Sequence, residues 1–92
     1  MGGTDKIGAY EAVGANRTYA HLGGAEFSFR SWARAVRSGN TFMTTGPLLL
    51  FTVDGHVPGE EINFGAGGGS VEVHAKATCF FPVHRLEVVL NG

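Results

Sequence analysis

The 92-residue chain has one cysteine, three prolines and no long hydrophobic run. A single cysteine excludes an internal disulfide and a cysteine-based zinc site. The longest uninterrupted apolar stretch, Pro47–Phe51, is much too short to cross a bilayer, so no membrane partner is expected. Residues 1–5 lack a basic region followed by an apolar run, so no export signal is recognised and a cytoplasmic location is the default expectation.

Charge is also scarce and nearly balanced. Seven Lys and Arg residues stand against eight Asp and Glu residues, for a formal net charge of −1. Nucleic-acid-binding domains normally carry a basic surplus, so nucleic acid is not an expected partner. The chain is instead 43% hydrophobic and 11% aromatic, with 15 glycines. This composition is typical of one small folded domain with a thin core.

One short helix is expected in the first half of the chain. Ser31 is a suitable N-cap residue. Trp32, Ala35 and Val36 then fall on one apolar stripe, at i, i+3 and i+4. Gly39 follows where a left-handed C-terminal cap residue belongs. Because about two turns are marginal alone, we expect Trp32 to pack on a sheet.

Short strands account for most of the remaining pattern. They are expected over residues 17–22, 41–45, 48–53, 61–64, 71–79 and 86–90. Alternation is cleanest over 71–79, where Glu72, His74 and Lys76 face away from the apolar residues. The pattern predicts a mainly β fold with one short helix, an antiparallel β-sandwich-like domain. Its expected core residues are Trp32, Phe42, Phe51, Val73 and Val88.

Both ends of the chain favour a domain that is incomplete relative to a longer parent. Asn91-Gly92 is a strong hairpin signal after an apolar strand, but no return strand follows. Gly3-Thr4-Asp5 resembles a loop whose preceding strand is missing. We expect a loop-rich arm over residues 1–24, then the helix and antiparallel sandwich over residues 25–92.

The last expected strand is an exposed apolar edge, which is a template for pairing with another chain. Its charges are Arg85 and Glu87, which could approach their opposites across a two-fold axis. The sequence therefore predicts a homodimer, through this edge or by exchange of the Gly-rich arm before Glu26. The arm could also fold back on its own edge, which would leave a monomer.

Several segments together resemble one known family. They are Gly3–Lys6, Asn16–Tyr19, Trp32–Pro47, Val53–Gly55 with Pro58-Gly59, and Leu86–Gly92. The most specific part is Gly-x-Thr-Phe-x-Thr-x-Gly-Pro, which begins at Gly39 and ends with Gly46 and Pro47. The chain thereby resembles the CehA/McbA-type metallohydrolases of the PHP (polymerase and histidinol phosphatase) superfamily. The resemblance implies the end of a metal-binding barrel followed by an accessory β-sandwich.

Asp5 matches the last barrel-edge aspartate of that family, which resembles a metal ligand. In a complete barrel, His, Asp and Glu side chains would hold a divalent metal that serves hydrolysis of ester or phosphoester-like bonds. In this chain alone we expect a solvated loop carboxylate and no cofactor, because such a site needs three or more convergent ligands. Ile7 also stands where the wider superfamily often has His.

Three arginines form a second candidate site. Arg30, Arg34 and Arg37 are spaced i, i+4 and i+7, opposite the apolar stripe of the helix. One interpretation is an ordinary solvated face. The other is a face that binds an anionic ligand or partner.

Gly46-Pro47 is a structural motif. Proline cannot donate a ladder hydrogen bond, so Pro47 should mark the end of one strand and the corner into the next. Thr44 and Thr45 could satisfy the freed backbone groups there, or the corner could be a plain turn.

No complete catalytic constellation occurs, so no catalytic residue is expected. Three functions remain open. The favoured one is a non-catalytic accessory β-sandwich fragment of a PHP-type metal-dependent hydrolase. The alternatives are a freestanding binding module, acting through the Arg-rich helix face or an open sheet edge, and an enzyme in its own right.

Overall fold

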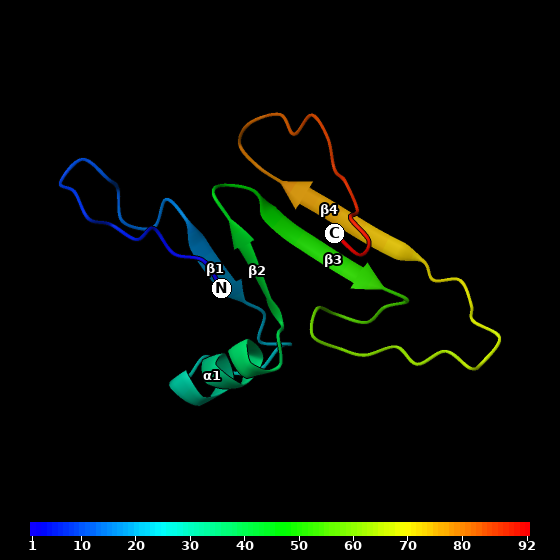
Figure 1. Ribbon diagram of the computed structural model, residues 1–92. Coiled ribbons are helices and arrows are strands. Elements are labelled where there is room, and N and C mark those ends of the chain that lie inside the picture. The colour runs from blue at the N-terminus through cyan, green and yellow to red at the C-terminus, as the bar shows by residue number, and fades with distance from the viewer.

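One helix and four strands make up the regular structure of the chain, which a computed structural model describes over residues 1–92 (Figure 1). They are β1 (Arg17–Ala20), α1 (Phe29–Arg37), β2 (Thr41–Thr44), β3 (Leu48–Val53) and β4 (Val73–Thr78). β1 pairs with β2 and β3 pairs with β4, each antiparallel, in two separate two-stranded sheets. The expectation of a mainly β fold with one short helix is confirmed. Packing of the two sheets as a sandwich stays a prediction.

The helix begins three residues earlier than the sequence interpretation placed it. Ser28 is the N-cap, and its Oγ accepts a hydrogen bond from the Ser31 amide at 3.1 Å. Ser31 Oγ in turn accepts from the Ser28 amide at 2.9 Å, which completes a reciprocal capping box. The prediction of Ser31 as N-cap is therefore wrong. Ser31 is the third residue of the helix, and its side chain bonds back to the amide of the N-cap, Ser28. Gly39, with φ of 77°, ends the helix as expected.

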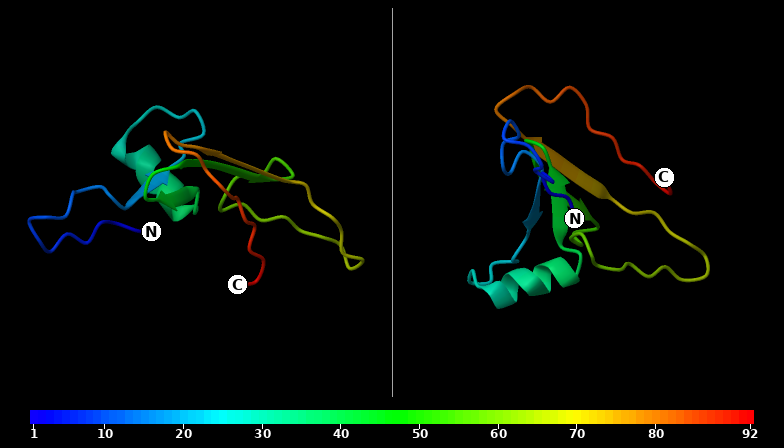
Figure 2. Two further views of the ribbon diagram at one scale, coloured as in Figure 1. Left: turned by 90° about the horizontal axis from the view of Figure 1, so that it is seen from above. Right: turned by 60° about the vertical axis from the view of Figure 1, so that its left-hand side comes forward.

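The helix lies across the ends of β1 and β2 and not on a sheet face (Figures 1 and 2). Its apolar stripe therefore buries Ala35 but leaves Trp32 41% exposed. The Trp32 ring instead lies 5.9 Å from the Phe29 ring of the same helix. The placement of Trp32 in the core is thus wrong.

The β1–β2 sheet joins the two segments that the sequence divides at residue 24. Tyr19 and Phe42 are direct cross-strand partners, and their rings stack with centroids 5.3 Å apart. Stacked aromatic pairs add stability to a strand pair beyond backbone hydrogen bonds. The arm over 1–24 and the segment over 25–92 thus share one sheet.

The β3–β4 register separates an apolar face from a mixed one. One side of the pair carries Leu49, Phe51, Val53, Val73, Ala75 and Ala77, hereafter the apolar sheet face. Since successive strand residues point to opposite sides, Leu50 and its partner Lys76 lie on the other side. His74 lies there too, and its Nε2 is 2.7 Å from Glu72 Oε1. The alternation predicted over 71–79 is confirmed for the residues of β4.

Two expected strands do not form. Residues 61–64 belong to the long connection between β3 and β4, and residues 86–90 follow β4 without regular structure. A strand needs a neighbour for its backbone N–H and C=O groups, and no strand pairs with either segment. Arg85 Nε lies 2.9 Å from Glu87 Oε1, so these charges pair within the chain. Residues 86–90 therefore offer no regular strand edge, and the homodimer stays a prediction.

The core is smaller than the sequence predicts. Ala35 and Thr44 are the two buried residues, and Val88 is 62% exposed. The radius of gyration is 15.9 Å, against about 12 Å for a compact domain of this length. No helix is long and apolar enough to pass through a membrane.

Candidate functional site

The residues that precede Asp5 are held against the β1–β2 sheet. The Thr18 hydroxyl accepts from the Gly2 amide and donates to the Gly2 carbonyl, both at 2.8 Å. A Cβ at Gly2 would overlap the Met43 side chain, so a larger residue here would require Met43 to move. Thr4 Oγ1 also accepts from the Gly14 amide at 2.9 Å, which closes the arm into a loop. Gly2 and Thr4 thereby fix the start of the segment that carries Asp5.

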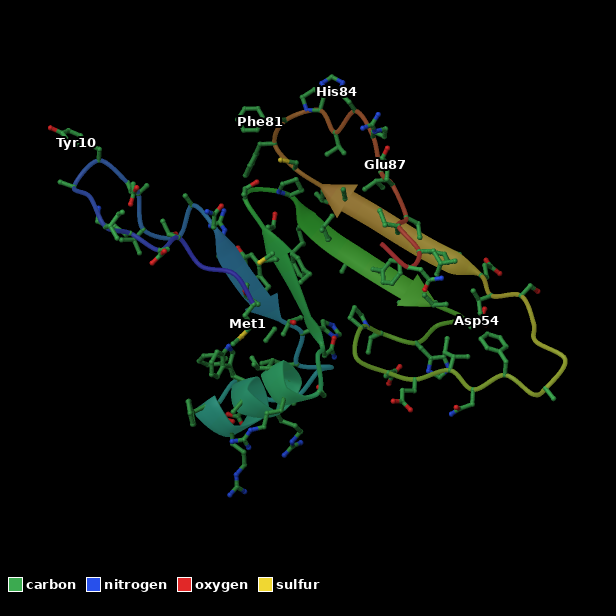
Figure 3. The ribbon with its side chains drawn as sticks, viewed as in Figure 1. Met1, Tyr10, Asp54, Phe81, His84 and Glu87 are labelled. Atoms are coloured by element: carbon green, nitrogen blue, oxygen red, sulfur yellow. The ribbon has the colours of Figure 1, made fainter.

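Asp5 itself is exposed, with a positive φ of 48°. No group of three or more His, Cys, Asp and Glu side chains is placed to hold a metal ion. Asp5 therefore has no partners with which to chelate a cation, and its role in a complete barrel stays a prediction. Tyr10 lies at the far tip of the same loop (Figure 3).

Thr44 braces the Gly46-Pro47 corner. Thr44 is 8% exposed, and its Oγ1 donates to the Pro47 carbonyl at 2.6 Å. The same oxygen accepts from the Gly46 amide at 2.9 Å. One buried hydroxyl thus bonds both the Gly46 amide and the Pro47 carbonyl in the turn between β2 and β3. Of the two alternatives that the sequence left open, the structure has the threonine brace and not the plain turn. Thr45, the other candidate, is exposed.

An open groove of about 500 Å³ lies between the arm and this corner. It is lined by Gly2, Gly3, Asn16, Met43, Thr44, Thr45, Pro47 and Leu49. Two of the segments that resemble the metallohydrolase family, the one leading into Asp5 and the one ending in Pro47, therefore face each other across one hollow. The lining holds no charged or nucleophilic side chain other than threonine hydroxyls, which gives it no evident chemistry of its own.

A contact between two glycines was not foreseen from the sequence. The Val57–Glu60 turn closes with the Glu60 amide donating to the Val57 carbonyl at 3.2 Å, and Gly59 has φ of 93°. A Cβ at Gly59 would overlap the carbonyl oxygen of Ser38. A Cβ at Gly39 would lie 3.2 Å from the Gly59 Cα. The helix end and this turn therefore touch backbone to backbone.

Arg30, Arg34 and Arg37 surround a second hollow, together with Ser38. None of the three arginines takes part in an ion pair, since the ion pairs of the structure involve other residues. The first turn of α1 also contains no acidic residue. Three uncompensated positive charges therefore share one side of the helix, which fits either interpretation of this face.

The histidines are dispersed. His56 Nδ1 contacts Glu60 Oε2 at 3.2 Å within its own loop, and His84 lies on the loop that follows β4 (Figure 3). Cys79, the single cysteine of the chain, is half-buried. None of these side chains joins the residues around Asp5.

No family model, curated protein or solved structure matches the chain.

Proposed function

We propose that this chain is the non-catalytic accessory β-rich part of a PHP-type metal-dependent hydrolase, together with the last barrel segment that leads to Asp5. In this role the chain contributes no reacting group. It supports the segment that carries one metal ligand of the parent.

The observation that carries the proposal is the attachment of Gly2 to the β1–β2 sheet. Two hydrogen bonds to Thr18 and close contact with Met43 hold the backbone three residues ahead of Asp5. A metal ligand on a loop needs such support, because metal sites depend on neighbouring groups that orient the residues binding the metal. β1 and β2 would supply that support in the parent.

The segments that resemble the hydrolase family also stabilise particular backbone conformations in this chain. Thr44 ties the Gly46-Pro47 corner, and Gly39 packs against Gly59. Thr44 provides a buried hydroxyl, and Gly39 and Gly59 provide small size and a positive φ. None of the three presents a reactive atom to solvent. These roles fit a structural accessory part better than a catalytic one.

Two measurements test the proposal. The chain is incubated with bis-p-nitrophenyl phosphate and p-nitrophenyl acetate in the presence of Zn²⁺ or Mn²⁺, with EDTA as control. We expect no chelator-sensitive hydrolysis; metal-dependent turnover would contradict the proposal. The coding DNA ahead of the Met1 codon should encode in-frame barrel segments with His, Asp and Glu ligands, and an in-frame stop codon immediately upstream would also contradict it.

A second candidate function is binding of an anionic partner by the Arg face. The observation in its favour is that Arg30, Arg34 and Arg37 line one hollow without any carboxylate. Titration with tripolyphosphate at low salt should then give saturable binding that weakens with ionic strength. Arg34→Gln should weaken it, while Arg85→Gln, an arginine already paired with Glu87, should not. If the two variants weaken tripolyphosphate binding equally, the chain attracts the anion through its overall positive charges and not through the Arg face.

A further inference from the structure

The exposed side of α1 carries two kinds of side chain. Arg30, Arg34 and Arg37, which make up the Arg face, are exposed along one flank of the helix. Successive helical residues are rotated by about 100°, so Phe29 and Trp32 fall on the other flank. Their rings lie 5.9 Å apart, and the two residues are 80% and 41% exposed. α1 therefore presents a cationic flank and an aromatic flank to solvent.

A third aromatic side chain stands just ahead of the helix. Phe27 precedes the N-cap Ser28 and is 80% exposed. A hydrophobic residue at this position often packs onto the fourth residue of the helix, here Trp32, but Phe27 is too exposed to serve in this way. Large apolar side chains that gather at an exposed surface mark sites of contact with a protein or a membrane.

The charge of the chain is unevenly distributed between α1 and the rest. Three of the seven basic residues lie on this helix, which contains no acidic residue, although Glu26 precedes it. The ion pairs of the structure leave all three arginines uncompensated. The remainder of the chain carries four basic and eight acidic residues. A negatively charged surface therefore attracts the helix and repels the remainder, which orients the molecule with α1 toward that surface.

An anionic lipid surface suits both flanks of α1. Helices that lie in the headgroup layer of a membrane carry Lys or Arg on one side and Trp or Phe on the other. A soluble polyanion would engage the arginines alone and leave the aromatic side chains in water. α1 also lies at the margin of the molecule, so its long side can meet a flat surface (Figures 1 and 2). The expectation of no membrane partner came from the length of the apolar runs, which bears on spanning a bilayer and not on adsorption to it.

We propose that α1 docks this chain onto an anionic lipid surface, with Phe27, Phe29 and Trp32 in the interfacial layer and the Arg face on the lipid headgroups. The inference rests on the second proposed function, anion binding by the Arg face, and names the anion. It does not depend on the hydrolase proposal. Each arginine near an anionic membrane contributes about fivefold to the partition coefficient, so the contact is reversible and the removal of one charge is measurable.

The test is binding to vesicles of equal parts phosphatidylcholine and phosphatidylserine, compared with vesicles of phosphatidylcholine alone. Trp32 is the single tryptophan of the chain, so its emission reports directly on α1. We expect a blue shift and co-sedimentation with the anionic vesicles, both weakened by salt, and neither with the neutral vesicles. Arg34→Gln should lower the partition coefficient about fivefold. Arg85→Gln, an arginine already paired with Glu87, should leave it unchanged.

Phe29→Ala distinguishes a lipid surface from a soluble polyanion. It should lower vesicle partitioning several-fold, because less apolar surface enters the membrane, and leave tripolyphosphate binding unchanged. Phe81→Ala is the matched control, since Phe81 is 77% exposed and lies on the loop after β4, away from α1 (Figure 3). Phe27→Ala, outside the helix, repeats the test if circular dichroism shows that Phe29→Ala disturbs α1.

Three results would overturn the inference. They are no binding to the anionic vesicles, equal binding to the neutral ones, and vesicle binding that Phe29→Ala and Phe27→Ala weaken no more than Phe81→Ala does. Tripolyphosphate binding that depends on Arg34, without vesicle binding, would overturn the lipid assignment alone and indicate a soluble polyanion. Loss of both kinds of binding would overturn the second proposed function as well.

Discussion

Gly39 and Gly59 hold the end of α1 against the Val57–Glu60 turn by direct backbone contact. Both residues have positive φ, 77° and 93°, a conformation that favours glycine. At Gly59 a side chain is also excluded by space, because its Cβ would overlap the Ser38 carbonyl oxygen. The contact joins two of the segments that carry the family resemblance. At Gly39 the contact adds a tight approach, with a Cβ at 3.2 Å from the Gly59 Cα, to the role of this glycine as a helix cap.

Gly59→Ala tests this contact. The added methyl would overlap the Ser38 carbonyl oxygen and strain the backbone. We expect a loss of about 2–4 kcal/mol in the free energy of unfolding, measured by urea denaturation. Gly67→Ala is the control, because a Cβ at Gly67 has no neighbour within 4 Å. Equal stability of the two variants would show that the contact does not form in solution.

Thr44→Val tests the corner between β2 and β3. The substitution keeps the shape of the side chain but removes the donor to Pro47 and the acceptor for Gly46. Burial of Thr44 leaves these groups unpaired, which should cost about 1–3 kcal/mol of stability. Thr45→Val, at the exposed neighbouring position, should change stability by less than about 0.5 kcal/mol. If the corner is a plain turn, neither Thr44→Val nor Thr45→Val will lower the free energy of unfolding.

Thr18→Val tests the attachment of the arm. Valine suits a strand, so β1 should persist while both hydrogen bonds to Gly2 are lost. Limited trypsinolysis should then cleave after Lys6 several times faster, because local opening of the arm becomes easier. Cleavage after Arg85, which lies outside the arm, is the internal control. Unchanged cleavage after Lys6 would remove the support for the proposed function.

Calorimetry with Zn²⁺ or Mn²⁺ near neutral pH tests Asp5. A lone carboxylate lacks the convergent ligands that tight binding requires, so we expect nothing tighter than about 1 mM. A stoichiometric site of micromolar affinity would contradict the accessory interpretation and favour an enzyme. Asp5→Asn would then show whether the carboxylate is one of the ligands.

The sequence patterns identified the apolar faces of the helix and strands, but not the elements that pack against those faces. Alternation over 71–79 correctly placed Val73 opposite His74 and Lys76, because strand geometry is local. The predicted burial of Trp32 required a sheet face beneath the helix, but the helix lies across the strand ends. The predicted strand at 86–90 required a neighbouring strand, and no strand pairs with it. The Gly39–Gly59 contact joins segments 20 residues apart in the numbering, which no local pattern encodes. Ser28 could have been found, since Ser28 and Ser31 have the spacing of a capping box.

Neither sheet is a local hairpin, and this has a kinetic consequence. β1 reaches β2 across residues 21–40, and β3 reaches β4 across residues 54–72. Each pairing must first close a long loop at a cost in chain entropy, so folding should be slow for a chain of this length. α1 is the one element that can form from neighbouring residues alone. During that delay the hydrophobic side of β3 is open to other newly made chains, so the rate of synthesis bears on how much of the protein aggregates.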